Sequence, residues 1–350
     1  WAKTICFVAD DGDNNLHFKQ ADRQLVPIAD TLNSGFIIKK IYSDAHTKVK
    51  IPGGYRYPEV NTKIANQVEE GSLILNYTGH GGLIGWSEEL ILDVPTINAF
   101  SNSSNLPLFI TATCEFSRFD DPEFTSAGEY VFLNEEGGGI ALMTTTRLAF
   151  ASANIILNMR LYDNLLKRED GQIPRLGDMN RMAKNPSSTN FLNFTLLGDP
   201  ALQLDFPEYE VQTLSVNNEE LTLAADTVNA MLEVSISGRI VDENGSFTES
   251  FNGYLYPVVY DKASNYKTLG NTQGSYPADF ELVDKVLFKG KTTVKNGLFS
   301  FDFLVPKDIS YKYGYGKISY YAMDTISNHD AWGGYNNIIV GGTDETAVDD

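Results

Sequence analysis

One histidine and one cysteine each follow an apolar run, where strands of an α/β sheet are expected to end. His80 lies between Gly79 and Gly81, shortly after the apolar run at 73–75, and Cys114 directly follows the run 108–113. An imidazole beside a cysteine favours the nucleophilic thiolate and can later protonate a leaving amine. Either residue alone would be a weak signal. Both at the ends of consecutive runs predict a thiol nucleophile with a histidine base.

Three aspartates follow the first apolar run, in the segment Asp10-Asp11-Gly12-Asp13. A carboxylate beside a catalytic histidine holds one tautomer and stabilises the imidazolium, and we expect Asp11 to do this for His80. Asp10 and Asp13 offer oxygen ligands of the kind that calcium prefers, although the run lacks EF-hand spacing. The chain has no CxxC or HxxxH pair, so we expect no zinc site and no other cofactor.

The two glycines around His80 have a chemical use as well. Gly79 and Gly81 let the backbone turn sharply and approach a substrate closely. The backbone amides of Gly81 and Cys114 are therefore our candidate donors to the oxyanion that forms during acyl transfer.

Further polar and aromatic residues lie near these positions and are candidates for a substrate pocket. They are Glu115, Trp86, Thr144, Thr145 and Arg147. Two alternatives remain open for this region. Arg118 can form a local ion pair with Asp120 or Asp121, and Trp86 can cap the hydrophobic core.

The elements that must position these residues alternate between strand and helix through the first 205 residues. We expect strands at 4–9, 36–42, 73–77, 108–113 and 139–143. We expect helices at 18–32, 57–68, 93–100, 126–133 and 153–166. The apolar face predicted for the last helix consists of Ile155, Ile156, Met159, Tyr162 and Leu166. Strands joined by crossover helices indicate a parallel sheet covered on both faces, with function at the carboxyl ends of its strands.

The pattern changes after Pro207. Segments of alternating apolar and polar residues are separated by turn signals, and no helix is predicted, which is typical of an antiparallel β-sandwich. The segments are 234–241, 253–260, 285–288, 298–305 and 317–322. We therefore predict an α/β domain at 1–205, a sandwich at 206–340 and an acidic linker or tail at 341–350.

Composition excludes some classes of function. The net charge of −19 argues against nucleic-acid binding, which needs a basic surface. No run of eighteen apolar residues is present, so no membrane-spanning helix is expected. The chain opens with Trp1-Ala2-Lys3 and enters a strand at once, and we expect a fragment of a longer precursor.

Three segments carry a resemblance to a known family. They are Asn76-Tyr77-Thr78-Gly79-His80-Gly81, the run from Leu106 to Cys114, and Leu197-Gly198-Asp199-Pro200-Ala201. Together they resemble the gingipain family of cysteine peptidases. The resemblance implies that His80 and Cys114 form a catalytic dyad, with Asp11 as the third catalytic acid. It also implies a caspase-like α/β fold, closed by Asp199-Pro200 and followed by an immunoglobulin-like sandwich.

The resemblance is strongest in 8–13, 112–122 and 143–148, which look like the sortase-like branch of the family in the type IX secretion system of Bacteroidota. It implies a cell-surface, outer-membrane-associated enzyme that removes the C-terminal signal domain of exported polypeptide cargo. It also implies attachment of the new carboxyl end to anionic lipopolysaccharide, with outer-membrane partners of the PorV and PorZ types.

Three further expectations accompany the resemblance. The family's first catalytic subdomain lies outside these residues, so this segment alone is expected to be inactive. The acidic residue behind arginine specificity has no counterpart here, so trypsin-like specificity is not carried over. A caspase-like strand order puts one strand between Cys6 and Cys114, roughly 10 Å of separation, which excludes a disulfide between them.

Two other functions remain open. One is an ordinary secreted gingipain-like protease, which shares the dyad but releases its product to water. The other is a non-catalytic surface scaffold, in which the caspase-like domain only binds.

Overall fold

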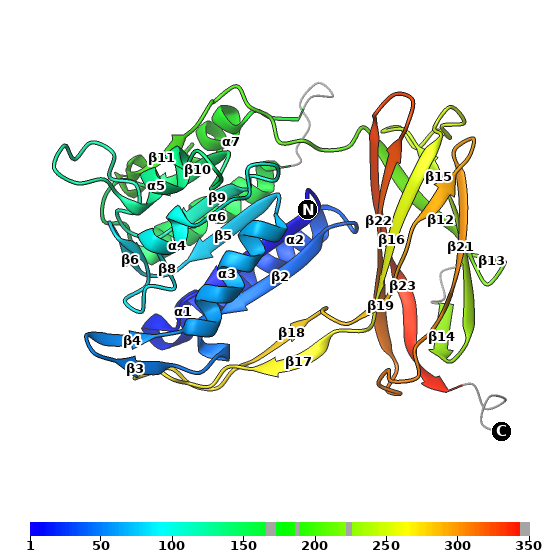
Figure 1. Cartoon of the computed structure of the whole chain (residues 1–350), viewed down its shortest axis with the longest axis horizontal. Coiled ribbons are helices and arrows are strands. Elements are labelled where there is room, and N and C mark those ends of the chain that lie inside the picture. Colours follow the sequence, from blue (N-terminus) through cyan, green and yellow to red (C-terminus); the bar gives the residue numbers. More distant parts are fainter. Residues whose placement is uncertain (166–172, 186–188, 222–225, 344–350) are drawn as a thin grey trace. The chain divides into compact units, whose positions relative to one another are not determined.

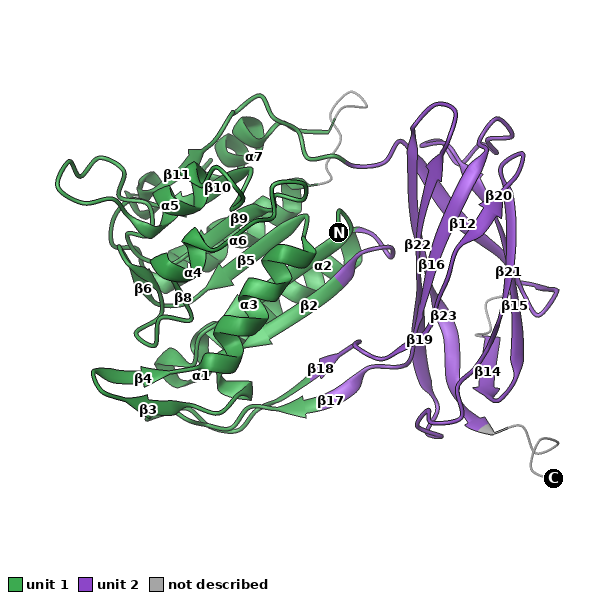
Figure 2. Ribbon diagram, viewed as in Figure 1, with its two compact units in different colours: residues 1–32, 38–205, 266–280 green, residues 33–37, 206–265, 281–350 purple. Residues whose placement is uncertain are grey.

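The computed structural model describes residues 1–165, 173–185, 189–221 and 226–343. The chain divides into two compact units, coloured separately in Figure 2. Unit 1 comprises residues 1–32, 38–205 and 266–280, and unit 2 comprises 33–37, 206–265 and 281–350. None of the helices in the described part of the chain is long and apolar enough to cross a membrane.

The centre of unit 1 is a six-stranded sheet with the order β11-β10-β9-β5-β1-β2 (Figure 1). Its strands are β1 (Thr4–Ala9), β2 (Ile37–Tyr42), β5 (Ile74–Thr78), β9 (Leu108–Ala112), β10 (Ala141–Thr145) and β11 (Phe194–Leu197). The neighbours β1, β5, β9 and β10 run parallel, as the sequence predicts, and β5 does lie between β1 and β9. The unpredicted strand β11 pairs antiparallel with β10 and closes one edge.

Alternate side chains of the sheet pack against helices on its two faces. Cys6 and Tyr77 belong to a buried cluster that includes side chains from α3 (Pro58–Glu70) and α5 (Ala127–Leu133). On the other face, Phe7 meets Tyr162 of α6 (Ala151–Leu165) at 5.6 Å between ring centroids. Because successive side chains of a strand alternate in direction, apolar residues at every position require two covered faces.

The remaining helical segments of unit 1 are short. They are α1 (Gly12–Lys19), the π-helical η1 (Gln20–Leu25), α2 (Val26–Leu32), the 3₁₀ segments η2 (Ser43–Ala45) and η3 (Thr189–Asn193), α4 (Val94–Asn98) and α7 (Leu176–Ala183). Small separate sheets also belong to the unit: β3 (Val49–Ile51) pairs with β4 (Gly54–Arg56), and a three-stranded sheet consists of β6 (Gly81–Gly82), β7 (Gly85–Trp86) and β8 (Leu92–Asp93).

The segment Tyr266–Phe280 belongs to unit 1, although its neighbours in sequence belong to unit 2 (Figure 2). Within unit 1, the amides of Gly270 and Asn271 donate to the buried Asp44 carboxylate at 2.9 and 2.7 Å. Unit 1 reaches residue 205 from the N-terminal side and also takes in this later segment. A contiguous domain at 1–205 is therefore an incomplete description of unit 1.

Unit 2 is all-β, and its hydrogen-bonded strand path is β19-β16-β22-β23-β12-β15-β21. These strands are β12 (Tyr209–Val216), β15 (Glu233–Val241), β16 (Gly253–Tyr260), β19 (Val286–Lys289), β21 (Leu298–Leu304), β22 (Gly314–Asp324) and β23 (Asp330–Thr343). Shorter strands of this unit are β13 (Glu219–Glu220), β14 (Asp226–Ala230) and β20 (Thr292–Val294). The strands β17 (Ser264–Lys267) and β18 (Asp279–Leu282) pair with each other, and each lies partly in the unit 1 segment 266–280.

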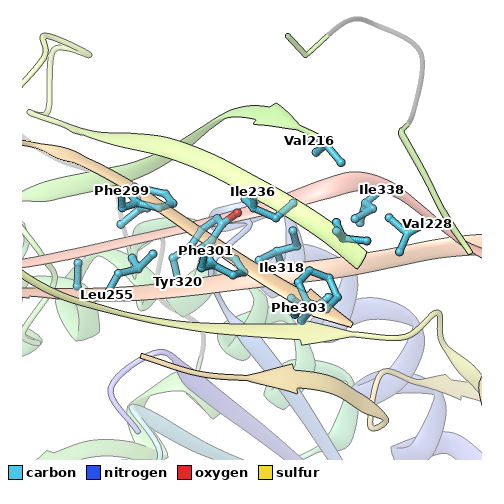
Figure 3. Close-up of a cluster of buried hydrophobic side chains, with 14 of the residues drawn as sticks. Val216, Val228, Ile236, Leu255, Phe299, Phe301, Phe303, Ile318, Tyr320 and Ile338 are labelled. Atoms are coloured by element: carbon cyan, nitrogen blue, oxygen red, sulfur yellow. The ribbon is translucent and has the colours of Figure 1, made fainter. Parts of the chain in front are cut away.

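An apolar cluster forms the core of unit 2 (Figure 3). Phe299, Phe301 and Phe303 alternate along β21 and pack into this cluster together with Ile236 and Ile318. Residues 341–343, predicted as the start of an acidic linker or tail at 341–350, belong to β23, which continues to Thr343. The rest of that tail lies outside the described residues.

Candidate active site

The register between β5 and β9 brings His80 and Cys114 to the same level of one sheet edge. Thr78 pairs with Ala112, and His80 and Cys114 each follow two residues later. The amide of Gly79 donates to the carbonyl of Ala112 at 3.4 Å, which keeps the two chains together beyond the strands. The predicted adjacency of the two strand ends is confirmed.

Cys114 carries a free thiol with only weak contacts. Its sulfur lies 3.5 Å from the carbonyl oxygen and 3.4 Å from the amide nitrogen of Ala149. Cys6 is also free and fully buried in β1, and burial raises the pKa of its thiol to about 12. The expected absence of a Cys6–Cys114 disulfide is confirmed, and Cys6 is the unreactive member of the two.

The backbone directly after Cys114 adopts an uncommon conformation. Glu115 has a φ of 50°, in the left-handed region that residues other than glycine seldom adopt. The Glu115 amide donates to the carbonyl of Arg147 at 3.3 Å, and that of Ser117 donates to Thr145 at 3.0 Å. Such conformations cost free energy and are found disproportionately at functional sites.

The backbone of His80 is fixed by three hydrogen bonds. Its amide donates to Asp10 Oδ2 at 2.6 Å, and its carbonyl accepts from the Tyr77 hydroxyl at 2.5 Å and the Ser87 amide at 2.8 Å. The side chain is half exposed, and Nε2 lies 3.2 Å from Asp13 Oδ2. Within the described residues, no hydrogen bond joins His80 to Cys114. Catalytic hydrogen bonds are often long in a substrate-free enzyme and shorten when the substrate binds.

A left-handed turn brings Asp13 to His80. Asp13, Asn14 and Asn15 have φ values of 52°, 57° and 64°, a conformation that Asp and Asn tolerate better than most residues. Gly12 precedes them, and a Cβ at this position would lie 2.7 Å from Cδ2 of His80. Only glycine therefore lets the turn pass this close to the imidazole.

Asp11 does not contact His80, contrary to the sequence expectation. Its Oδ2 accepts hydrogen bonds from Tyr57 at 2.6 Å, from Lys48 at 3.1 Å and from the hydroxyl of Thr272. Burial raises the pKa of the Asp11 carboxyl, but these hydrogen bonds and the Lys48 charge outweigh it and lower the pKa overall. Asp11 thus anchors the loop, and the carboxylate that faces His80 belongs to Asp13.

Asp10 has a different environment from its neighbour. It is buried, and burial raises the pKa of its carboxyl, although the nearby His17 and His80 and two backbone amides act in the opposite direction. Potential metal-ligating atoms of Asp10, His17 and His80 lie within 4.8 Å of one another. Asp10 and Asp13 are the calcium candidates predicted from the sequence. His17 was not predicted as a ligand, because it is far from His80 in sequence and has no motif around it.

Three of the pocket candidates are core residues. Trp86 has no exposed surface and stacks on Tyr77 at 4.3 Å between ring centroids. The Thr144 hydroxyl is buried and accepts from the Thr111 hydroxyl at 2.7 Å, and the Thr145 hydroxyl donates to the carbonyl of Thr113 at 2.7 Å. All three side chains are buried and are therefore not exposed to a substrate.

The two other pocket candidates take part in surface ion pairs. Arg147 binds Asp120 through two nitrogens at 2.8 and 2.5 Å. Arg118 lies 3.4 Å from Glu115 and 3.5 Å from Asp121. The alternative of a local Arg–Asp pair is confirmed for Arg118 and Asp121.

The proposed oxyanion donors are available in this geometry. Ser87 donates to the carbonyl of His80, so in the antiparallel β6–β7 pair Gly81 and Trp86 occupy a non-hydrogen-bonded position. The Gly81 amide therefore points away from β7. The backbone amide of Cys114 donates no hydrogen bond to any of the described residues. A Cβ on Gly81 would lie 2.5 Å from the Thr113 hydroxyl, so this position also requires glycine.

Several solved structures resemble the chain. Dimeric latent PorU from Porphyromonas gingivalis is 26% identical, with a TM-score of 0.38, over 52% of this chain and 18% of PorU. The Arg-specific cysteine proteinase gingipain R is 14% identical, with a TM-score of 0.47, over 97% of this chain and 67% of that one. The complex of the pro- and mature domains of Porphyromonas gingivalis RgpB is 14% identical, with a TM-score of 0.45, over 97% of this chain and 68% of that one.

The chain thus spans less than a fifth of the PorU structure. No curated protein sequence matches it. The sequence model of peptidase family C25 matches residues 1–205, which cover more than half of the chain and contain His80 and Cys114. This chain therefore belongs to peptidase family C25.

Proposed function

We propose that the chain carries the catalytic centre of a cysteine peptidase, with Cys114 as nucleophile and His80 as general base and acid. One observation carries the proposal: the β5–β9 register brings both residues to the same level of one sheet edge in a member of family C25. We assign the role of orienting His80 to Asp13 instead of Asp11, because the Asp13 carboxylate lies 3.2 Å from His80 Nε2.

The reaction follows from these positions. His80 takes the thiol proton from Cys114, and the sulfur attacks the scissile carbonyl carbon to form a tetrahedral oxyanion. The amides of Gly81 and Cys114 donate to that oxyanion. The C–N bond then breaks, His80 delivers its proton to the leaving amine, and a thioester to Cys114 remains. Asp13 stabilises the imidazolium between these two proton transfers.

The group that attacks the thioester next distinguishes a hydrolytic peptidase from a transpeptidase. Water yields a free carboxylate, whereas an amine yields a new amide bond. We favour the amine, because segments 112–122 and 143–148 resemble the sortase-like branch of the family. The enzyme would then remove the C-terminal signal domain of type IX cargo and attach the cargo to anionic lipopolysaccharide. This activity takes place at the cell surface with partners of the PorV and PorZ types, and unit 2 serves as an immunoglobulin-like companion domain.

The test uses the full-length enzyme that contains this chain. Cargo ending in its signal domain is incubated with the partner proteins, with and without an amine acceptor, and the new carboxyl end is analysed by mass spectrometry. We expect acceptor at that end, and uncut cargo with Cys114→Ala. Cys6→Ala is the matched control, since Cys6 is buried away from the site and its variant should still cut.

Each competing function has its own outcome. Free carboxylate alone at saturating acceptor would establish an ordinary gingipain-like peptidase. Cutting by Cys114→Ala within a few-fold of the unmodified enzyme would refute Cys114 as the nucleophile. Complete absence of cutting with every cargo tested would favour a non-catalytic surface scaffold.

A further inference from the structure

We propose that Asp10, His17 and His80 form a binding site for a divalent transition-metal ion of the zinc class, and that the bound ion reversibly inhibits the enzyme. The proposed binding site is argued from the geometry of these three residues alone. The inhibition rests on the proposed function, because it requires His80 to act as the catalytic base.

Three separate elements bring the ligands together. Asp10 follows β1, His17 lies in α1, and His80 follows β5. One ligand atom from each lies within 4.8 Å of the others, and the two imidazole rings are 5.0 Å apart in an edge-on arrangement. Ligand atoms around tetrahedral zinc lie about 3.3 Å apart, given metal–ligand bonds of about 2.0–2.1 Å. Small side-chain rotations therefore close the site around an ion.

His17 supplies the observation that points to a ligand. Its side chain is almost fully buried, and its Nδ1 lies 3.2 Å from Gln20 Oε1. The Gln20 amide nitrogen donates to the carbonyl of Ala151 at 3.3 Å, so the oxygen is the atom that faces His17. An amide oxygen only accepts, and His17 therefore carries its proton on Nδ1.

The other nitrogen of His17 is left with a free lone pair. Nε2 is buried and has no hydrogen-bond partner in the described part of the chain, the nearest charged group being Asp13 at 3.7 Å. A buried acceptor without a partner costs free energy, which a bound cation would recover. An imidazole whose other N–H is held by an oxygen is the usual arrangement of a metal ligand.

The remaining ligands are held in place by the backbone. Asp10 accepts from the amides of His80 and Gly12 at 2.6 and 3.3 Å, which fixes the orientation of its carboxylate. Asp13 lies at the exposed side of the cluster, 3.2 Å from His80 Nε2, where it can act as a fourth ligand. Two imidazoles with one or two carboxylates suit zinc-like ions, whereas calcium prefers oxygen ligands throughout.

Metal binding would withdraw His80 from catalysis. With the ion on Nε2, the remaining proton of the neutral imidazole lies on Nδ1, so neither nitrogen of His80 can accept the proton of Cys114. Cys114 itself is not one of the three clustered residues. The site therefore differs from one in which the ion binds directly to the catalytic thiol, and this difference can be measured.

Binding is measured first, on the full-length enzyme, by calorimetric titration with Zn²⁺. We expect His17→Gln to weaken zinc affinity by about 10- to 100-fold, the loss that disturbing a metal site typically produces. His46→Gln is the matched control, because His46 pairs with Glu59 at 3.0 Å outside the cluster, and it should bind as the unmodified enzyme does. Cys114→Ser should also keep its affinity within about twofold, well below a tenfold ligand effect.

Spectroscopy of the unmodified enzyme tests the ligands without any variant. Co²⁺ in the proposed site should give visible d–d absorption and no sulfur-to-cobalt charge-transfer band. X-ray absorption of the zinc form should show only nitrogen and oxygen neighbours. A charge-transfer band, a sulfur neighbour, or loss of binding in Cys114→Ser would overturn the proposed ligand set. Unweakened binding by a folded His17→Gln variant would also overturn it.

The inhibition is tested by cargo cleavage at increasing zinc. Cleavage should fall, return after EDTA, and require about tenfold more zinc for half-inhibition in His17→Gln, in proportion to its weaker binding. Zinc binding at the predicted ligands with undiminished cleavage would overturn the inhibitory role. An enzyme that binds zinc as expected but never cuts cargo without metal would instead count against the proposed function.

Discussion

Two loops at the carboxyl edge of the unit 1 sheet are built in opposite ways. The loop after β1, residues 10–15, holds buried carboxylates with defined partners and a left-handed turn. The loop after β9, residues 114–121, holds a thiol with weak backbone contacts and ion pairs at the surface. We infer that the first loop fixes the shape of the site, whereas the second supplies the reactive atom. Substitutions in the first loop should therefore impair the structure of the site, whereas substitutions in the second should impair the reaction itself.

The largest effect is expected at the reactive atom. Cys114→Ala should lower the rate of cargo cleavage by about 10³- to 10⁶-fold, because the covalent step is lost. The thermal unfolding midpoint should stay close to that of the unmodified enzyme, since the sulfur makes only weak contacts. Steady-state cleavage and calorimetric unfolding check both parts. A large fall in the midpoint would show that the second loop is structural as well.

The next effect is on stability and arises in the first loop. Asp11→Ala removes an acceptor from Tyr57, Lys48 and Thr272, and should lower the free energy of unfolding by about 1–3 kcal/mol. Lys48 retains Glu89 at 2.8 Å, which limits the loss. Urea unfolding at neutral pH measures the change. An unchanged midpoint would contradict the anchoring role.

The same variant should change the acid sensitivity of the fold. The pKa of Asp11 is lowered in the folded state, so its contribution to stability is present above the ordinary carboxyl pKa and is lost as pH falls through the lowered value. Asp11→Ala should therefore lose less stability than the unmodified enzyme on acidification through this range.

Asp10 should have the opposite effect on stability. Its pKa is raised in the folded state, so its charged carboxylate destabilises the fold at neutral pH. Asp10→Asn should remove this destabilising contribution.

A smaller catalytic effect is expected at Asp13. Asp13→Asn keeps the size of the side chain but removes the charge 3.2 Å from His80 Nε2. A hydrogen bond to a charged group contributes about 1.5–3 kcal/mol, so cleavage should slow by about 10- to 100-fold. The pH–rate profile should shift as well, because the charged imidazolium loses its partner. If Asp11→Asn shifts the profile and Asp13→Asn does not, the orienting role returns to Asp11.

The smallest effect is expected at the surface of the second loop. Arg147→Gln breaks the pair with Asp120, and exposed pairs contribute little because solvent and salt screen them. Cleavage and the unfolding midpoint should both stay within experimental error of the unmodified enzyme. A clear loss of cleavage with unchanged stability would instead identify Arg147 as a substrate contact.

The sequence predicts several strands well because local patterns determine them. The expected strands 4–9 and 253–260 match β1 of unit 1 and β16 of unit 2 residue for residue, and β5 lies between β1 and β9 as expected. The inward face of α6 is less well predicted. Ile156 is 46% exposed, whereas Asn158 is buried and pairs with Asn76 of β5. A hydropathy pattern cannot anticipate a polar pair buried between a helix and a sheet.

The candidate site could also be predicted only in part from the sequence. Apolar runs and a caspase-like strand order predict the strand ends that carry His80 and Cys114, but they do not predict the directions of the side chains. Asp10 and Asp11 are adjacent and face different partners, because consecutive side chains diverge. Asp13 reaches His80 only through a left-handed turn. The edge strand β11 and the long strand β23 were missed since pairing with distant partners defines them.

The place of Tyr266–Phe280 in unit 1 has a consequence for how the molecule is made. A ribosome completes the strands of the unit 1 sheet long before it reaches residue 270. Until then, the buried Asp44 carboxylate lacks the amides of Gly270 and Asn271, and Asp11 lacks the hydroxyl of Thr272. The loop that faces His80 therefore lacks these contacts in any chain that ends before residue 270.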